Sequence, residues 1–342
     1  MSGTSLDGID LTEINFSYSE EKWNFEIATA ETIPYSSFWK DKLANALKYS
    51  EEKLERLDFK YTEMLSEEIS KFIKKSNIQE IDAVSSHGHT ILHRPDKGFT
   101  YQIGNLPRIS KLLGQTVVCD FRVQDVELGG QGAPLVPIGD RMLFPEYDYC
   151  LNLGGFANCS FEKTNERIAF DICPVNIVLN KYAEKLGKEF DEGGKLAASG
   201  KIDRNVLEKL NSLPFYKANP PKSLGLEWVK ETVFPILDAS EISSEDILRT
   251  FTEHIAIQLS KQFAINTSVL VTGGGAYNSF LMERLKSLAP IDVIIPDSDI
   301  VEYKEALIFG LLGVLKLREE VNCLASVTGA EYDHSSGKIL SP

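Results

Sequence analysis

Glycine clusters flanked by hydroxyl and carboxylate side chains are the part of this chain best suited to chemistry. The first lies at residues 2–8, where Ser2, Thr4 and Ser5 supply hydroxyl donors. Backbone amides in such a loop can approach a phosphate closely, because glycine has no side chain to keep it away. The carboxylates of Asp7 and Asp10 would repel that phosphate unless a cation lay between them. The loop therefore predicts Mg²⁺ wherever it holds ATP.

Two more glycine clusters, Gly154-Gly155 and Gly273-Gly274-Gly275, each follow a run typical of a buried strand. A single glycine loop is more often a plain hairpin turn than a binding site. Three loops of this kind together favour cradles for phosphate and nucleotide. None of them matches the Walker A or the Rossmann G-x-G-x-x-G pattern, so those two nucleotide folds are disfavoured.

Several polar residues allow more than one interpretation. His87, His89 and His93 are close enough in sequence to suggest a metal site, but the loop character of Gly88 between the first two disfavours it. His254 lies in an apolar helical stretch and is expected in the core or at a cleft.

Arg122, Asp125 and Glu127 precede the glycine-rich residues 129–134. They form either a solvated rim or a pocket, and their position after a buried strand favours the pocket.

Alternating apolar and polar residues at 11–17 and 22–33 predict paired strands. Apolar residues at three- and four-residue spacing predict a helix over 51–75. Further short strands are expected at 81–85, 116–119, 149–153, 156–161, 168–170, 268–271 and 293–295, and helices at 177–186, 279–288 and 305–317. Alternating strands and helices indicate an α/β class. A strand, a glycine turn and a second strand open each half, which predicts two similar lobes with a cleft between them.

The 342 residues suggest two domains. We expect them at 1–140 and 141–342, with a C-terminal segment that can pack back on the first. Hydrophobic residues make up 43% and charged residues 25%, as in ordinary soluble proteins. A net charge of −14 disfavours nucleic acids and anionic membranes as partners. The five cysteines form no C-x-x-C pair, and with no secretion signal or membrane span in the sequence we expect a cytoplasmic protein.

Longer motifs resemble one family. They are Met1-Ser2-Gly3-Thr4-Ser5-Leu6-Asp7-Gly8-Ile9-Asp10, His87-Gly88-His89-Thr90, Gln102-Ile103-Gly104-Asn105, Asp120-Phe121-Arg122, Gly129-Gly130-Gln131-Gly132-Ala133-Pro134, Leu151-Asn152-Leu153-Gly154-Gly155-Phe156-Ala157-Asn158, Gly273-Gly274-Gly275 and Ser326-Val327-Thr328-Gly329-Ala330. This set, which spans nearly the whole chain, resembles the anhydro-N-acetylmuramic acid kinases of the acetate and sugar kinase, Hsp70 and actin superfamily.

The resemblance implies a two-lobed, duplicated actin-like (ribonuclease H-like) ATPase fold with an interlobe cleft. It also implies a kinase that uses ATP and Mg²⁺ to open the 1,6-anhydro bridge of a cell-wall sugar. Water adds at C1, and O6 takes the γ-phosphoryl group, giving N-acetylmuramic acid 6-phosphate for recycling. The expected partners are this sugar and ATP, and a homodimer is left open.

The same resemblance assigns the site residues. Asp171 is the expected base for the attacking water, and Asp7 is expected at the metal. The expected nucleotide-binding residues are Gly3, Thr4, Ser5, Leu6, Asp7, Gly8, Ile9, Asp10, Gly154, Gly155, Asn158, Gly273, Gly274, Gly275 and Asn278. The expected sugar-binding residues are His87, Arg122, Gly132, Ala133, Pro134, Asn176 and Glu305.

The chain departs from the family pattern at Asp171-Ile172-Cys173-Pro174-Val175-Asn176, where a threonine and two glycines are replaced. Further departures occur at His89, Asn105 and residues 222–227. Two alternatives follow from these changes: a kinase for a different anhydro sugar, and a nucleotide-binding protein with little turnover.

Overall fold

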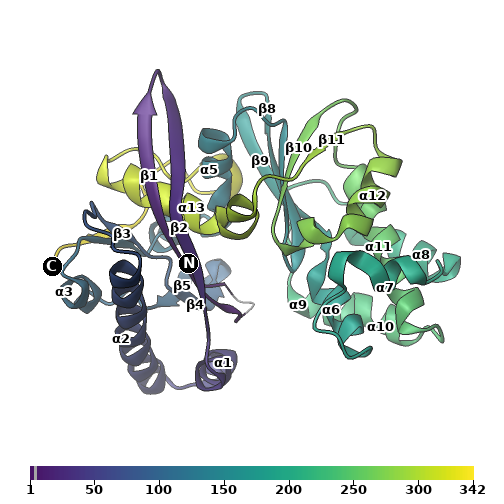
Figure 1. Ribbon diagram of the computed structural model, residues 1–342, viewed down its shortest axis with the longest axis horizontal. Coiled ribbons are helices and arrows are strands. Elements are labelled where there is room, and N and C mark those ends of the chain that lie inside the picture. The colour runs from purple at the N-terminus through teal and green to yellow at the C-terminus, as the bar shows by residue number, and fades with distance from the viewer. Residues whose placement is uncertain (4–5) are drawn as a thin grey trace. The chain divides into compact units, whose positions relative to one another are not determined.

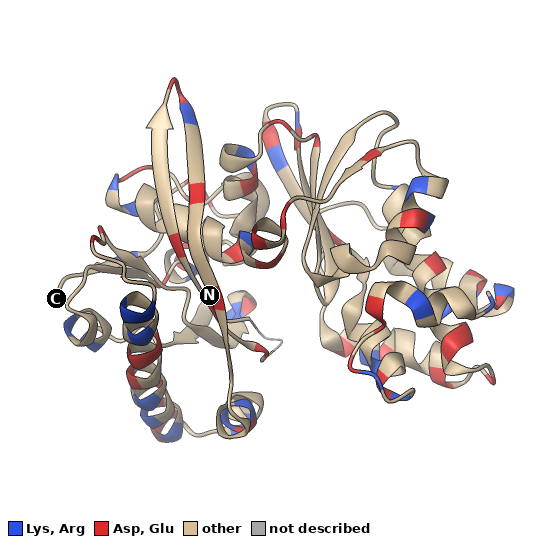
Figure 2. Cartoon of the chain, in the orientation of Figure 1, with Lys and Arg blue, Asp and Glu red and all other residues tan. Residues whose placement is uncertain are grey.

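The structure is a computed structural model that describes residues 1–3 and 6–342. Strands and helices follow one another along most of the chain (Figure 1), as the predicted α/β class requires. Acidic and basic side chains are interspersed along the helices (Figure 2). Among the described residues, no helix combines the length and the apolar character needed to cross a membrane.

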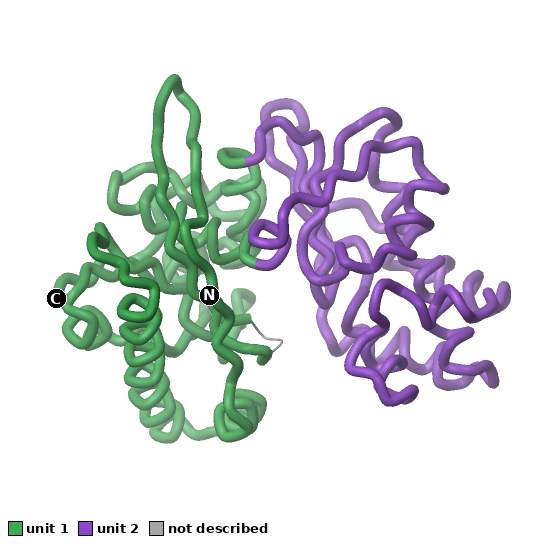
Figure 3. The backbone as a smooth tube through the Cα atoms, viewed as in Figure 1, with its two compact units in different colours: residues 1–143, 303–342 green, residues 144–302 purple. Residues whose placement is uncertain are grey.

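The chain forms two compact units, residues 1–143 with 303–342 and residues 144–302 (Figure 3). The return to the first unit falls within helix α13 (Ser298–Leu317), between Glu302 and Tyr303. The second unit is therefore continuous in sequence, whereas the first is built from both ends of the chain.

The elements of the first unit are β1 (Gly8–Ser19), β2 (Lys22–Pro34), α1 (Ser37–Ala44), α2 (Glu51–Lys75), β3 (Val84–Ser85), β4 (His89–Arg94), β5 (Phe99–Ile103), α3 (Arg108–Leu113), β6 (Val117–Cys119), α4 (Val123–Glu127), α5 (Val136–Leu143), most of α13, α14 (Ala325–Thr328) and β12 (Lys338–Leu340). Those of the second are β7 (Tyr149–Leu153), β8 (Phe156–Lys163), β9 (Glu166–Pro174), α6 (Asn176–Glu184), α7 (Lys195–Ser199), α8 (Arg204–Asn211), α9 (Leu226–Trp228), α10 (Phe234–Asp238), α11 (Ser244–Ser260), β10 (Ser268–Thr272), α12 (Ser279–Leu288) and β11 (Asp292–Ile294).

Strands β1 and β2 form the predicted antiparallel hairpin. Gly8 begins β1, and a side chain there would collide with the backbone of Ile33 on β2. Met1 and Asp10 exchange backbone hydrogen bonds of 2.6 and 2.8 Å, which hold the first residue against β1. Residues of β1, β3, α2 and α13 line a cavity of about 740 Å³ in this unit.

Helix α2 has the predicted bounds. Its buried residues recur at three- and four-residue spacing, and they include Leu54, Leu57 and Tyr61. Glu51 and Glu52 in the first turn and two lysines in the last complement the helix dipole.

The remaining strands of the first unit are short. Strands β12, β6 and β3 form one sheet, with β3 parallel to β6, and β4 pairs with β5 as a hairpin. The strand predicted over 81–85 covers only Val84–Ser85. His87 follows β3 and Arg122 follows β6, and both residues belong to the candidate site.

The second unit is built on a five-stranded sheet with the order β11-β10-β7-β8-β9. β10 runs parallel to β7, whereas β7, β8 and β9 form an antiparallel meander. The turn after β7 and the loop after β10 therefore emerge at the same edge of the sheet. Those two connections are the second and third glycine clusters of the sequence.

The largest differences from the predicted boundaries are at β9 and α13. Strand β9 extends past residue 170 to Pro174, because Asp171, Ile172 and Cys173 continue its pairing with β8. Helix α13 begins seven residues before the predicted Glu305, at Ser298. All five cysteines are free thiols and buried, in agreement with the sequence-based expectation of no disulfide framework.

Candidate active site

The N-terminal loop is held by a chain of buried side chains. The Ser2 hydroxyl lies 2.6 Å from the Tyr35 hydroxyl and 2.9 Å from Nδ1 of His89, and Tyr35 continues the chain to Tyr61 at 2.6 Å. Burial lowers the pKa of His89 to about 4, so its imidazole is neutral at neutral pH. This neutral network fixes the start of the loop without placing a charge beneath it.

Two carboxylates follow this loop and differ in their surroundings. Asp7 is exposed, and its carboxylate accepts no hydrogen bond from any described residue. Asp10 accepts a hydrogen bond of 2.7 Å from the hydroxyl of Thr32 across the hairpin. Leu6 has a positive φ of 61°. Thr4 and Ser5 of the predicted nucleotide site lie outside the described residues.

Arg122 follows β6, and its guanidinium is oriented by two bonds. Its Nε donates to Nε2 of His87 at 2.9 Å, and a terminal nitrogen donates to the carbonyl of Gly132 at 2.6 Å. Nδ1 of His87 lies 3.0 Å from the Gly88 carbonyl, which makes it the protonated ring nitrogen and leaves Nε2 as an acceptor. Burial, and then the charge of Arg122, hold the pKa of His87 well below its usual range. His87 packs edge-on against Phe309 at 4.7 Å between ring centroids.

The glycine loop at 129–134 is held in place by a hydrogen bond to Asp125. Oδ2 of this fully buried carboxylate accepts from the Gly132 amide at 2.6 Å. Gly132 has a φ of +66°, and a side chain there would approach Val126 to 2.8 Å. Glu127 is exposed. The polar cluster predicted here therefore divides into a half-buried Arg122, a buried anchor and a solvated residue.

Glu305 on α13 lies in the same unit as Arg122. Desolvation by the surrounding protein atoms raises the pKa of its carboxyl, and the charge of Arg122 opposes that rise. A carboxyl and a guanidinium that influence each other in this way can together bind the hydroxyl and amide groups of a sugar.

The other histidines have partners of their own. Nδ1 of His93 lies 3.1 Å from the Thr100 hydroxyl. His254 is fully buried between the Asn211 amide oxygen at 2.8 Å and the Tyr216 hydroxyl at 3.0 Å. His254 was expected in the core or at a cleft, and the structure places it in the core.

In the second unit, the loop at 273–275 packs tightly against the end of β7. Gly273 has a φ of +80°, and a side chain there would approach the Asn152 side-chain oxygen to 2.6 Å. A side chain at Gly275 would approach Cβ of Leu153 to 2.7 Å. Glycine is therefore required at both positions to bring this backbone against the strand.

The turn at Gly154-Gly155 connects β7 to β8 and is hydrogen-bonded to the residues at the start of α6. The Gly155 carbonyl accepts from the Val175 amide at 2.8 Å, and the Asn176 side chain donates to the Leu153 carbonyl at 3.2 Å. A side chain at Gly155 would meet only Ile177, at 3.9 Å. The turn is thus open on the face where a ligand could approach it.

A cavity of about 540 Å³ lies beside these loops, a size that suits a small-molecule ligand. Its lining residues are Asn176, Leu179, Asn180, Phe190, Asp191, Glu192, Gly193, Lys195, Gly274, Gly275, Tyr277 and Asn278. The backbone of the glycine loop forms one wall, and the partly exposed rings of Phe190 and Tyr277 offer flat apolar surface. A backbone wall and flat apolar rings are features that suit the binding of a nucleoside.

Asp171 lies inside β9, opposite Asn158 of β8 and beside a register shift in the pairing. Its Oδ2 accepts from the Leu224 amide at 2.8 Å, and its own amide donates to the Lys222 carbonyl at 3.0 Å. No described residue donates to Oδ1. Burial raises the pKa of the Asp171 carboxyl, which the Leu224 hydrogen bond partly offsets.

The sequence matches a family model described as anhydro-N-acetylmuramic acid kinase over residues 1–342. The chain belongs to the anhydro-N-acetylmuramic acid kinase family. It is 32% identical to the protein of that name from Mannheimia succiniciproducens, with 99% of this chain and 97% of that protein aligned. The family member from Pseudomonas syringae pv. tomato is 34% identical, covering 85% and 83% of the two chains.

Among solved structures, the activator of the 2-hydroxyisocaproyl-CoA dehydratase from Clostridium difficile with bound ADPNP is 14% identical, with a TM-score of 0.41. The alignment covers 90% of this chain and 96% of that one. Family membership rests on the sequence relatives, and it makes the chain a phosphotransferase with an alcohol group as acceptor.

The predicted site residues form one group in each of the two units. His87, Arg122 and Gly132 are joined by hydrogen bonds in the first unit. Gly274, Gly275 and Asn278 line one cavity in the second, together with Asn176, which had been predicted on the sugar side.

Asp171 does not cap helix α6. The residue before α6 is Val175, and the Asp171 carboxylate accepts from Leu224 instead of from that helix.

Sequence reasoning missed the residues that support the site. Phe309 beneath His87 lies more than 200 positions away in the chain and looked like any core residue of an apolar helix. Phe190 and Tyr277 were missed as well, because their exposure beside the cavity is visible only in the structure.

Proposed function

We propose that this protein is an ATP-dependent kinase that opens the 1,6-anhydro ring of anhydro-N-acetylmuramic acid and phosphorylates O6. The product is N-acetylmuramic acid 6-phosphate, used in cell-wall recycling in the cytoplasm. Two relatives that align with 99% of the chain carry the name anhydro-N-acetylmuramic acid kinase, which supports this proposal. They do not favour the alternatives of a different sugar or of little turnover.

The observation that carries the proposal is the state of Asp171. One carboxylate oxygen is fixed by the Leu224 amide, and the other accepts from no described residue. Burial raises the pKa of this carboxyl, so it has a greater affinity for a proton than an exposed aspartate does. These are the properties of a general base for water.

In the proposed reaction, water attacks the sugar and ATP donates the phosphoryl group. Oδ1 of Asp171 takes a proton from water while the water oxygen forms a bond to C1 of the sugar. The C1–O6 bond breaks, O6 takes the γ-phosphoryl group of ATP, ADP leaves, and Asp171 then releases its proton to solvent. The positive charge of Arg122, held by His87 and Gly132, binds and orients the sugar.

The nucleotide is assigned to the glycine loops. The cavity beside Gly274 and Gly275 takes the nucleoside, and the amides of Gly154-Gly155 and of residues 3–8 take the phosphates. Asp7 fits a role at Mg²⁺, because its exposed carboxylate accepts no hydrogen bond from a described residue. The ion would neutralise charge on the transferring group.

The test is to run the reaction in water labelled with oxygen-18 and to analyse the product by mass spectrometry. One labelled oxygen should appear at the C1 hydroxyl and none in the phosphoryl group. ADP should form in equal amount and only when the sugar is present. Label in the phosphoryl group would mean that water attacks ATP and would contradict the proposal.

A further inference from the structure

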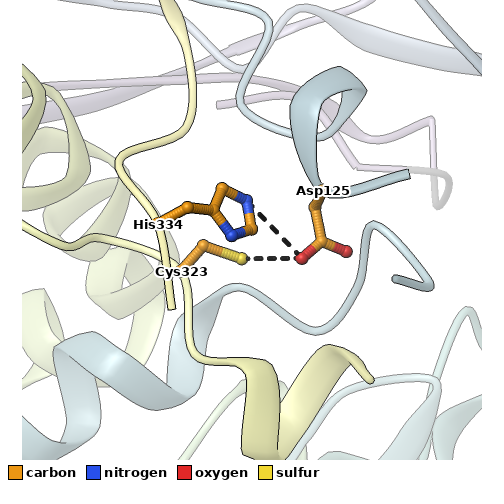
Figure 4. A group of neighbouring side chains, drawn as sticks. All are labelled: Asp125, Cys323 and His334. Carbon is orange, nitrogen blue, oxygen red and sulfur yellow. Dashed lines mark hydrogen bonds and ion pairs between the residues drawn. The ribbon is translucent and has the colours of Figure 1, made fainter. Parts of the chain in front are cut away.

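Three buried side chains of the first unit converge away from the residues assigned to catalysis. They are Asp125 on α4, Cys323 just before α14, and His334 in the C-terminal segment. One ligand atom from each lies within 4.8 Å of the other two. Figure 4 shows the thiol and the imidazole both directed at the carboxylate.

The backbone fixes the two C-terminal members of this group. Cys323 and His334 form an antiparallel bridge, with two amide-to-carbonyl hydrogen bonds of 3.1 Å between them. Their side chains are therefore held side by side. Sγ of Cys323 lies 3.0 Å from Oδ1 of Asp125, and Nε2 of His334 lies 3.7 Å from the same oxygen.

The second ring nitrogen of His334 decides what Nε2 can do. Nδ1 lies 3.0 Å from the Tyr332 carbonyl, an acceptor only, so Nδ1 carries the proton. In the neutral imidazole, Nε2 then presents a lone pair toward a carboxylate oxygen. This atom is buried and has no hydrogen-bond partner among the described residues, a state that buried polar atoms in folded proteins seldom keep.

A divalent cation satisfies all three atoms at once. Carboxylate oxygen, thiolate sulfur and imidazole nitrogen are the donors that zinc takes in proteins, and a histidine ligand usually donates its other N–H to a carbonyl, as His334 does. The charges also balance. One carboxylate and one thiolate neutralise Zn²⁺, which suits a site where all three residues are buried.

We propose that Asp125, Cys323 and His334 form a structural zinc site. Binding forms bonds from Zn²⁺ to Oδ1, Sγ and Nε2, and it releases the thiol proton of Cys323 to solvent. The Thr328 hydroxyl, 2.6 Å from Oδ1 of Asp125, or a water completes the four ligands. Because Oδ2 of Asp125 holds the Gly132 amide, the ion ties the C-terminal segment to the glycine loop.

The test uses the full-length protein, stripped with a chelator under reducing conditions and titrated with cobalt(II) chloride and then with zinc chloride. Cobalt bound through a thiolate gives a ligand-to-metal charge-transfer band in the near ultraviolet. We expect saturation at one ion per chain, displacement by zinc, and a higher melting temperature with zinc bound. Cys323→Ser and His334→Gln should each weaken binding at least about tenfold.

Cys150→Ser is the matched control, because it removes a buried thiol from the other unit and should leave the titration unchanged. Metal that binds equally to wild type, Cys323→Ser and His334→Gln would be adventitious and would overturn the proposal. So would the lack of a charge-transfer band in folded wild-type protein. The charge-transfer test of the wild-type protein does not depend on whether any variant folds.

Discussion

Nε of Arg122 donates to Nε2 of His87 at 2.9 Å, so a neutral histidine positions the guanidinium. The bond requires Nε2 to be unprotonated: the lowered pKa keeps the His87 ring neutral, and the Gly88 carbonyl holds its one proton on Nδ1. Two separate bonds from one guanidinium, to His87 and Gly132, use the planar geometry that distinguishes arginine from lysine.

Arg122→Lys should therefore weaken sugar binding while leaving ATP binding intact. A lysine ammonium keeps the charge but cannot reach both acceptors in the same geometry. Loss of a charge-assisted hydrogen bond, worth about 1.5–3 kcal/mol, predicts a rise of roughly tenfold or more in KM for the sugar. Steady-state kinetics measure it. Arg56→Lys, on an exposed turn of α2, is the control. An unchanged sugar KM would remove Arg122 from the sugar site.

Gly155→Ala should separate a phosphate-binding role from a structural one. The added methyl group would meet only Ile177, at 3.9 Å, so the melting temperature should not change. If the Gly155 amide contacts a phosphate, the methyl group will hinder that approach and ATP affinity will fall. Calorimetry with a non-hydrolysable ATP analogue measures the affinity. Equal affinity in a variant of normal stability would show that this turn does not face the nucleotide.

Asp7→Asn should raise the Mg²⁺ concentration needed for half-maximal rate, by about tenfold or more if Asp7 holds the ion. The change keeps size and removes charge. A Mg²⁺ titration at saturating ATP and sugar is the measurement. Asp82→Asn, at another exposed aspartate, is expected to match wild type. Identical titration curves for all three proteins would exclude Asp7 as the metal residue.

Glu253 on α11 lies outside the candidate site, and its ion pairs are expected to stabilise the folded protein. It is buried, and it accepts one hydrogen bond from Arg249 and two from Arg284, at 2.8–2.9 Å. Glu253→Gln should lower the free energy of unfolding by about 2 kcal/mol, in the range for hydrogen bonds to a charged group. Urea unfolding measures it. Glu192→Gln, whose partner Lys195 is equally exposed, should change nothing measurable.

The same carboxyl makes stability depend on pH. The two Arg284 hydrogen bonds, with the one from Arg249, hold the pKa of Glu253 below its ordinary 4.5. The unfolded chain then binds the proton more readily than the folded one. The contribution is complete above the unfolded pKa and is lost as the pH falls through the folded pKa. Glu253→Gln should reduce the stability difference between pH 7 and pH 4. An unaltered difference would contradict this assignment.

Local periodicity predicted the elements well where one face is buried. The bounds of α2 followed from its apolar spacing, and the hairpin of β1 and β2 followed from alternation. Asp171 was expected directly after a strand that ends at residue 170, whereas pairing with β8 carries that strand on to Pro174.

Contacts between distant segments could not be predicted. The sequence placed Asp125 beside a glycine loop, but nothing local indicated that Cys323 and His334 would pack against it. Such contacts depend on how helices and strands far apart in the chain pack together, and one sequence carries no local pattern for them.

The central claim, that Asp171 is the general base, is tested most directly by the turnover number of Asp171→Asn. Asparagine can still accept the Leu224 hydrogen bond, so the fold and the KM for ATP should be unchanged. Without a base, kcat for sugar phosphorylation should fall by about 10²- to 10⁴-fold. Because burial raises the pKa of Asp171, the acidic limb of the wild-type pH profile should lie above the ordinary range of an aspartate. Retention of more than about a tenth of wild-type kcat, a smaller loss than a general base supplies, would mean that another group accepts the proton.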